Sequence, residues 1–471
     1  MAGLLVRVSR YIVISLVHLF TLMDFYYFTK KTERGRIHVV MLQSVLMYTL
    51  QFLAGIILFA AHEDVAILLF YAAQLLVFAL YQKIYPAIYR RADRQLINNV
   101  LFLVEIGLIM QERLKMNKAW KQLLLLVIAM IVTLVVPKIL DNARKYLYRY
   151  TWFYGLGGLA MIAAILVAGR TEYGAKLSFG IAGFSIQPSE FVKITLVLFV
   201  AGMFHRSRDF KQIVVTTAVA ASHVLVLVGS KDLGTALIYF IAYIFMIYVA
   251  TEQIRYVFAG FSCGAVAAVL AYFMFSHLRV RVQIWRDPWS DISSSGWQIA
   301  QSLFGIGTGG WLGMGITGGT PGVIPVAEKD FIFSAMCEEM GVIVGCCVIL
   351  IYLNILMRFL WISSWMNLLF YKITALGLAC VFGFQVLINI AGVIKLVPLT
   401  GITLPFISYG GSSLLSTFFI FGIFEGLYMN KLREDESLRR EQAEREARRA
   451  SREAAVRKAQ LKMGGWQSDE R

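Results

Sequence analysis

The stretch KQLLLLVIAMIVTLVVPK, residues 121–138, has Thr133 as its one polar residue between Leu123 and Pro137. A helix of this length rises roughly 27 Å, which approaches the hydrocarbon thickness of a bilayer, about 30 Å. The whole chain shares this character: 58% of its 471 residues are hydrophobic and 16% are charged, whereas soluble domains carry about a quarter charged residues. The stretch therefore predicts a transmembrane helix, and the composition predicts a membrane protein.

Further apolar runs on both sides of this stretch approach the length of a membrane span. With it they predict an all-α, polytopic membrane protein of twelve spans. The run Tyr11–Met23, within segment 1–30, is too short for a span, and no small-residue cleavage site follows it. We therefore expect an interfacial helix at the cytoplasmic surface, and no signal peptide. The other runs are approximately 38–60, 65–85, 97–112, 152–168, 190–204, 212–228, 233–250, 257–276, 331–356, 370–393 and 404–428.

Lysine and arginine residues concentrate in every second loop, for example around Arg90 and Arg206. By the positive-inside rule these loops are cytoplasmic, so both termini are expected in the cytoplasm. This bias accounts for the net charge of +16, and no nucleic-acid partner is needed to explain it. The main exceptions, on the outer side, are Arg113, Lys115 and Lys118.

Two further features have conventional interpretations. The tail, residues 431–471, is rich in arginine, glutamate and alanine. This pattern favours a solvated cytoplasmic helix, with binding to anionic lipid headgroups as the alternative. The five cysteines lie in apolar runs without metal-ligand spacing, so they indicate buried side chains rather than a disulfide framework.

The longest connection between spans is the outer loop 277–330, and a shorter outer loop covers 169–189. Long loops are usually functional. The longer one is rich in glycine between Gly296 and Gly322, which permits close backbone approach. Irregular backbone at membrane depth must be buried in protein or line a wet cavity. We therefore expect this loop to turn back against the bundle and wall a cavity.

Ionisable residues in or beside the apolar runs are functional candidates. Glu190 and Lys193 are three residues apart, so they share a helix face and can pair. Asp232 precedes a span. Glu338 and Glu339 follow the long loop, and Glu105 lies in the run 97–112. A structural ion pair or a neutral, hydrogen-bonded carboxyl is the alternative for each, and for Glu105 the structural interpretation is preferred.

The long loop begins with Arg279, Arg281 and Arg286, followed by Asp287, Asp291, Trp297 and Gln298. Arginines can bind phosphate bidentately, and a neighbouring carboxylate can deprotonate a hydroxyl group. The tryptophans could stack on sugars or anchor at the membrane interface. This cluster suggests an anionic, lipid-linked substrate that arrives from outside.

Several motifs resemble those of the SEDS (shape, elongation, division and sporulation) family, which includes FtsW, RodA and SpoVE. Four motifs occur in the order and topology of that family, and the similarity covers about residues 97–430. The motifs are QPSEFVK at 187–193, DLGTA at 232–236, the loop that ends in DFIF at 330–333 with EEMG at 338–341, and PLTGITLPFISYGGSS at 398–413.

The resemblance implies a ten-span core at 97–430, preceded by two extra spans in 31–96. It implies a peptidoglycan glycosyltransferase of the bacterial cytoplasmic membrane that polymerises lipid II, the undecaprenyl-pyrophosphate-linked disaccharide peptide, and works with a class B penicillin-binding protein. It places the general base at Asp291, with Asp287 as the rival, and Mg²⁺ or Mn²⁺ as the expected ion where one is needed. The expected substrate-binding residues are Glu190, Lys193, Asp232, Arg279, Arg281, Trp297, Gln298, Asp330, Glu338 and Ser412.

The sequence departs from the family pattern at Ser230-Lys231, where family members usually carry Gln-Pro before the DLGT motif. The added cation could change pyrophosphate or partner contacts. A lipid II flippase and a non-catalytic scaffold are the alternative functions. Roles in division, elongation and sporulation all stay open, as does the role of the two extra spans.

Overall fold

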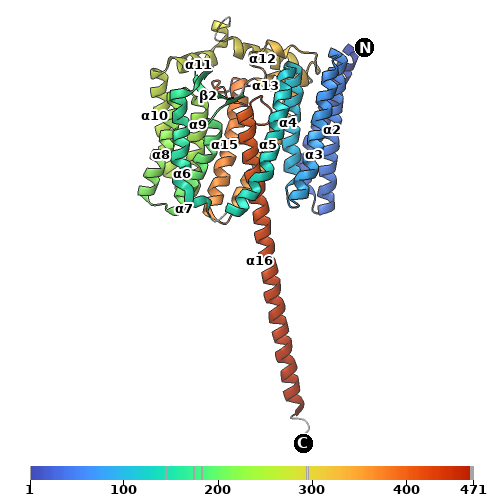
Figure 1. Ribbon diagram of the computed structural model, residues 1–471, viewed down its shortest axis with the longest axis vertical. Helices are drawn as coiled ribbons and strands as arrows, with labels where there is room; N and C mark the ends of the chain where they lie inside the picture. The colour runs from blue at the N-terminus through green and yellow to red at the C-terminus, as the bar shows by residue number, and fades with distance from the viewer. Residues whose placement is uncertain are drawn as a thin grey trace.

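The computed structural model describes residues 2–143, 146–172, 175–181, 184–292, 294 and 296–466. Its helices stand side by side in a bundle, and one very long helix leaves the bundle at the lower end (Figure 1). The long helices are α1 (Ala2–Thr29), α2 (Glu33–His62), α3 (Val65–Ile88), α4 (Arg94–Leu114), α5 (Met116–Ala143), α6 (Thr151–Ala168), α7 (Ser189–Arg206), α8 (Phe210–Gly229), α9 (Leu233–Thr251), α10 (Ile254–Met274), α14 (Val342–Trp365), α15 (Leu369–Val393) and α16 (Gly411–Trp466).

The predicted all-α, polytopic membrane fold is confirmed. Among the described residues, eleven helices are long and apolar enough to cross a membrane. Helices α4 and α7 are outside that set, yet both lie inside the bundle with most of their residues buried. Buried helices can carry more polar side chains than helices that face lipid, because neighbouring helices satisfy them.

The expectation of a short interfacial helix at the N-terminus is wrong. Helix α1 has 28 residues, because Ala2–Arg10 and Asp24–Thr29 continue it on both sides of the apolar run Tyr11–Met23. It packs along α2 and against α14, and Val17 and Phe20 are fully buried. A helix of this length, packed along its neighbours, qualifies as a further candidate span.

The two chain ends lie at opposite ends of the bundle (Figure 1), which contradicts the prediction that both termini are on the same side. Near the N-terminus, the Arg10 guanidinium donates to the Gly313 carbonyl at 3.5 Å, and Gly313 belongs to the long loop. We call this side the loop end and the side from which α16 projects the tail end. Helix α1 therefore begins at the loop end.

The predicted span 331–356 is two helices, α13 (Ile332–Met340) and α14. They are separated at Gly341, whose φ of 90° and ψ of 161° favour glycine. The predicted span 404–428 begins later than expected, since residues 401–410 are not helical and α16 starts at Gly411. Both differences move irregular backbone to the loop end.

The long loop is not structureless. It contains α11 (Ser276–Arg286), α12 (Trp297–Gly309) and the short 3-10 turns η2 (Pro288–Asp291) and η3 (Pro321–Val323), and α12 packs against α13 and α15. At its glycine-rich end, Gly315 N donates to the Glu339 carbonyl at 2.8 Å. The loop therefore turns back onto the bundle, as predicted.

The shorter loop forms a small antiparallel sheet of β1 (Arg170–Glu172), β2 (Ala175–Ile181) and β3 (Phe184–Ile186), in the order β1-β2-β3. Another short turn, η1 (Leu147–Tyr150), precedes α6 at the tail end. The sheet lies at the loop end, where β3 contacts the start of α16.

The extra helices are joined to the core by polar contacts. Gln82 of α3 donates to Asn98 Oδ1 of α4 at 2.8 Å, and Tyr48 of α2 donates to Gln82 Oε1 at 2.7 Å. Interhelical hydrogen bonds of this kind stabilise helix association inside membranes. The beginning of the tail is tied to the tail end of the bundle by ion pairs, including that of Arg433 with Asp141 of α5 at 2.6 Å.

Candidate active site

A cavity of about 410 Å³ opens at the loop end of the bundle. Its walls come from four places that are far apart in the sequence: the starts of α7 and α9, the helices α11 and α12, the segment before α13, and the irregular segment before α16. The lining residues are Gln187, Glu190, Lys231, Asp232, Thr235, Arg281, Ile284, Gln298, Ile299, Val326, Asp330, Phe331, Leu399, Thr400, Gly401, Ile402 and Thr403.

Opposite charges face each other across this cavity. The Arg281 guanidinium donates to the Thr400 carbonyl at 3.2 Å and lies within electrostatic reach of Asp232 and Asp330. Lys231 is in the left-handed backbone region with φ of 65°, and both Lys231 and Arg281 act on His277. The cavity thus offers two cations for an anionic group and three carboxylates, Glu190, Asp232 and Asp330, for hydroxyl or ammonium groups.

Burial shifts the pKa values of the charged side chains in the cavity. It raises the pKa of Asp330 to about 6, although the charges of Lys329 and Arg281 oppose the shift. Burial also raises the pKa of Asp232, against hydrogen bonds from Thr235, and lowers the pKa of Arg281. Because a guanidinium titrates far above neutral pH, Arg281 remains a cation.

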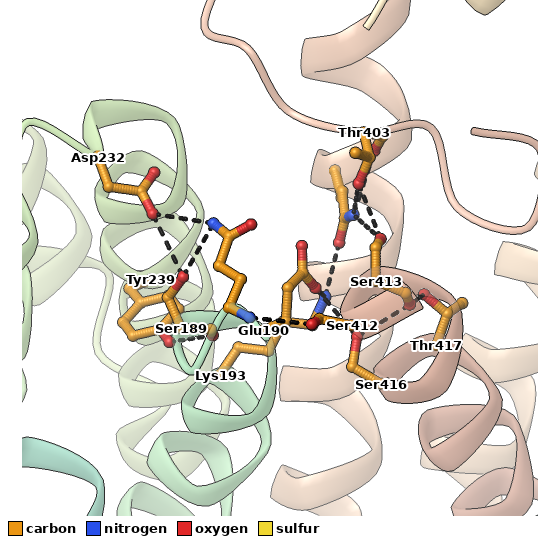
Figure 2. Close-up of polar contacts among 12 residues, drawn as sticks. Ser189, Glu190, Lys193, Asp232, Tyr239, Thr403, Ser412, Ser413, Ser416 and Thr417 are labelled. Atoms are coloured by element: carbon orange, nitrogen blue, oxygen red, sulfur yellow. Dashed lines mark hydrogen bonds and ion pairs between the residues drawn. The ribbon is translucent and has the colours of Figure 1, made fainter. Parts of the chain in front are cut away.

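Beneath the cavity, α7, α15 and α16 are joined by a buried polar network (Figure 2). Lys193 donates to the carboxylate of Glu190 and to Gln385 Oε1 at 2.9 Å, which confirms the predicted pairing of Glu190 with Lys193. Gln385 Nε2 donates in turn to the Thr403 carbonyl at 3.1 Å, and Ser416 donates to Glu190 at 3.0 Å. The network fixes the segment before α16 against α7.

A second part of the network reaches α9. The Asp232 carboxylate caps α9 by accepting from Thr235 N at 3.2 Å and also accepts from the Ser189 hydroxyl at 3.3 Å. Tyr239 donates to the Ser189 carbonyl at 2.6 Å (Figure 2). Aspartate at this position stabilises a helix start, which explains locally why the DLGT segment begins a helix.

Of the predicted substrate-binding residues, the structure brings five to the cavity wall: Glu190, Asp232, Arg281, Gln298 and Asp330. The other five do not line the cavity. Lys193 and Ser412 lie beneath it, and Ser412 accepts from Gln187 N at 2.9 Å. Glu338 is buried and accepts from Thr320 N at 2.6 Å, while Arg279 and Trp297 are exposed on α11 and α12.

Asp291, the predicted general base, does not line the cavity itself. It ends η2, between α11 and α12, which supply Arg281 and Gln298 to the wall. Its carbonyl accepts from Gly296 N at 2.9 Å. The rival, Asp287, is exposed, and its carboxylate accepts from Trp289 N at 3.0 Å, so it serves as the cap of this turn.

Sequence reasoning did not single out Gln385, and it identified the motif at 398–413 without assigning a role to the backbone of 399–403. Gln385 is buried in α15 and connects Lys193 to Thr403 and Ser413. A buried amide within an otherwise apolar run is a detectable signal, since polar groups inside a membrane need partners. The carbonyls of 399–403 carry no such signal, because their exposure depends on tertiary packing alone.

The described residues contain no group of three or more histidine, cysteine, aspartate or glutamate residues that could hold a metal ion. The cavity carboxylates Asp232 and Asp330 could still bind a metal ion more weakly than such a group would, as two ligands among several. Mg²⁺ is commonly held by one or two carboxylates together with substrate phosphates. The donor set therefore fits an ion that arrives with a phosphate-bearing ligand.

These features define a multi-pass helical membrane protein with a charged cavity at one end. The family model of the FtsW, RodA and SpoVE cell cycle proteins matches residues 89–432. The chain belongs to this family, and the resemblance seen in the motifs is confirmed.

Individual relatives agree with this assignment. The peptidoglycan glycosyltransferase RodA of Mycobacterium tuberculosis is 34% identical over 363 residues, which cover 70% of this chain and 76% of that protein. Stage V sporulation protein E of Bacillus subtilis is 34% identical over 288 residues, covering 58% and 77%.

Solved structures share the fold. A chain from a study of how a peptidoglycan synthase complex coordinates polymerization and crosslinking superposes with a TM-score of 0.63 and 23% identity, covering 72% of this chain and 98% of that chain. The rod shape determining protein RodA of Thermus thermophilus gives 0.55 and 22%, with coverage of 72% and 97%. Helices α1 to α3 precede most of the family-matched segment.

Proposed function

We infer that this protein is a peptidoglycan glycosyltransferase that polymerises lipid II at the loop end of the bundle. Family membership and relatives named for this activity support the reaction class. The observation that carries the proposal is the cavity in which Arg281 and Lys231 face Asp232 and Asp330. A pyrophosphate-linked sugar needs cations at the leaving group and polar groups for its hydroxyls, and this cavity supplies both.

We assign the reaction steps as follows. The acceptor 4-hydroxyl attacks the anomeric carbon of the donor, its proton passes to the Asp291 carboxylate, and the bond from that carbon to the pyrophosphate oxygen breaks. Undecaprenyl pyrophosphate leaves with the bond electrons. Arg281 and Lys231 offset its negative charge, the kind of electrostatic stabilisation that is usually a large term in catalysis. A Mg²⁺ or Mn²⁺ ion would add positive charge at the same group.

The place of Asp291 between α11 and α12 supports its assignment as general base. Both helices contribute to the cavity wall, so a ligand that enters between them passes η2. The carboxylate of Asp287, the rival, accepts from Trp289 N and caps the turn η2. A positioned general base typically contributes about 10²–10⁴-fold.

Polymerisation of labelled lipid II by the purified full-length protein tests this proposal. Asp291→Ala is expected to reduce the polymerisation rate at least about 100-fold, whereas Asp287→Ala should reduce it less. Thermal unfolding of both variants controls for damage to the fold. Wild-type rates in well-folded Asp291→Ala protein would refute the assignment of the base.

The orientation and partner belong to the same proposal. Basic loops and the arginine-rich tail gather at the tail end, which supports a cytoplasmic tail end in the bacterial cytoplasmic membrane. The loop end and the N-terminus are then outside. We also propose a class B penicillin-binding protein as partner, because one similar structure comes from a polymerising and crosslinking complex. Labelling by an impermeant thiol reagent of a cysteine introduced at Ser290, which is exposed at the loop end, or at Ser451, which is exposed in the tail, tests the orientation.

A further inference from the structure

A second polar hollow, which we call the lysine pocket, lies at the loop end where α5 begins. It has a volume of about 460 Å³ and is lined by Lys115, Met116, Asn117, Lys118, Lys121 and Tyr409. The three lysines follow one another at intervals of three residues, so their side chains neighbour one another on the helix surface. None of the lining residues belongs to the cavity described above.

The lysine pocket keeps an excess of positive charge. Glu328 pairs with Lys118 and, at 3.3 Å, with Lys115. Burial alone would raise the pKa of Glu328, but the hydrogen bond and charge of Lys118, followed by the charge of Lys115, bring it below its usual value. One carboxylate thus faces three ammonium groups. Lys121 is exposed, and the free N–H groups at the start of α5 add partial positive charge.

Topology does not account for these lysines. The positive-inside rule places lysine at the opposite end of the bundle, where most basic loops lie. Lys118 is also held 5.3 Å from the ring centroid of Tyr409, and Tyr409 N donates to the Glu328 carbonyl at 2.8 Å. Glu328 therefore holds Lys115 and Lys118 in place, and Tyr409, from the segment that precedes α16, lies against Lys118.

The lysine pocket and the central cavity share one wall. Val326 and Asp330 line the cavity, while Glu328, between them in the chain, pairs with the lysines. Four peptide units separate Val326 from Asp330, so their Cα atoms are at most about 14 Å apart. An anion in each hollow would lie on opposite sides of this short segment.

We propose that the lysine pocket is a second diphosphate subsite, which holds the diphosphate of one polyprenyl-linked substrate while the central cavity holds that of the other. This inference rests on the proposed function, because joining two lipid-linked sugars requires two diphosphates to be bound at once. Lysine suits such a group as a compact point charge with three donors. A free phosphate compound or an anionic phospholipid offers related chemistry, and the test separates these sources.

Calorimetric titration of the full-length protein in phosphatidylcholine nanodiscs with farnesyl diphosphate tests this subsite. Two binding sites are expected. Lys121→Gln should weaken one of them at least about tenfold, since a charge-assisted hydrogen bond is lost, and Arg281→Gln should weaken the other. Lys138→Gln, at the other end of the same helix, is the matched control and should leave both unchanged. Lys121 has no carboxylate partner among the described residues, so its loss should not disturb the fold.

Only one binding site in the wild-type protein, or two sites that both keep their affinity in Lys121→Gln, would overturn the proposal. So would full loss of the second site in nanodiscs that contain phosphatidylglycerol, because the pocket would then be a phospholipid headgroup site. Inorganic pyrophosphate that binds as tightly as farnesyl diphosphate would assign the pocket to free phosphate compounds and also contradict the proposal. Polymerisation of lipid II is measured separately: two diphosphate sites without polymerisation would refute the proposed function and leave the second site standing.

Discussion

The buried ion pair of Glu190 and Lys193 makes the sharpest stability prediction. The Lys193 side chain is 3% exposed and that of Glu190 is 11% exposed. Lys193→Met fills the same space without the ammonium group. It leaves the Glu190 carboxylate with the Ser416 hydroxyl as a donor, at 3.0 Å, and it removes the donor to Gln385 Oε1.

Loss of one partner from a buried pair costs about 3–5 kcal/mol, because the other charge remains desolvated and unpaired. We therefore expect Lys193→Met to lower the free energy of unfolding by this amount. The double variant Lys193→Met/Glu190→Gln removes the stranded charge as well. It should recover at least about half of the loss, since replacing both members of a buried pair is often nearly neutral.

Reversible unfolding of the purified protein in mixed micelles, followed by tryptophan fluorescence, measures these changes. The single variants and the double variant form a thermodynamic cycle that isolates the coupling between the two residues. A loss below about 1 kcal/mol for Lys193→Met, or strictly additive effects in the cycle, would refute the view that this pair is desolvated and mutually dependent.

Further predictions concern other parts of the loop end. Gly341→Ala should cost at least about 2 kcal/mol of unfolding free energy, because its Cβ would lie 2.4 Å from the Trp311 carbonyl oxygen. Gly307→Ala is the control and should be tolerated, because no atom lies within 4 Å of the position of its Cβ. Equal stability of the two variants in the same unfolding assay would contradict this prediction. Arg113→Gln leaves the buried Glu339 without its 2.9 Å partner and should cost about 3 kcal/mol, with recovery in Arg113→Gln/Glu339→Gln. The raised pKa of Asp330, about 6 against 3.8, contributes stability that is fully present below pH 3.8 and lost as the pH rises through about 6. Asp330→Asn should therefore flatten the pH dependence of unfolding between pH 4 and 7, and an unchanged profile would contradict the shift.

Local sequence patterns were sufficient to predict much of the fold of this protein. Apolar runs of near-membrane length predicted the spans, because lipid imposes that length on any helix that crosses it. The pairing of Glu190 with Lys193 was also predictable, since residues three apart on a helix are neighbours whatever surrounds them. The length of the N-terminal helix was predicted from the apolar run alone and was therefore too short, because flanking residues of mixed polarity continue the helix at both ends.

The sequence alone thus determined the helical membrane class, the family and the approximate composition of the cavity, since these depend on hydrophobic run lengths and on motifs that are local in the chain. Tertiary structure decided the rest. It placed the N-terminus at the loop end, separated α13 from α14 at Gly341, and brought Arg113 to Glu339 and Lys118 to Glu328. Partners more than 200 residues apart are selected by the packing of whole helices, so no spacing rule in the sequence can identify them.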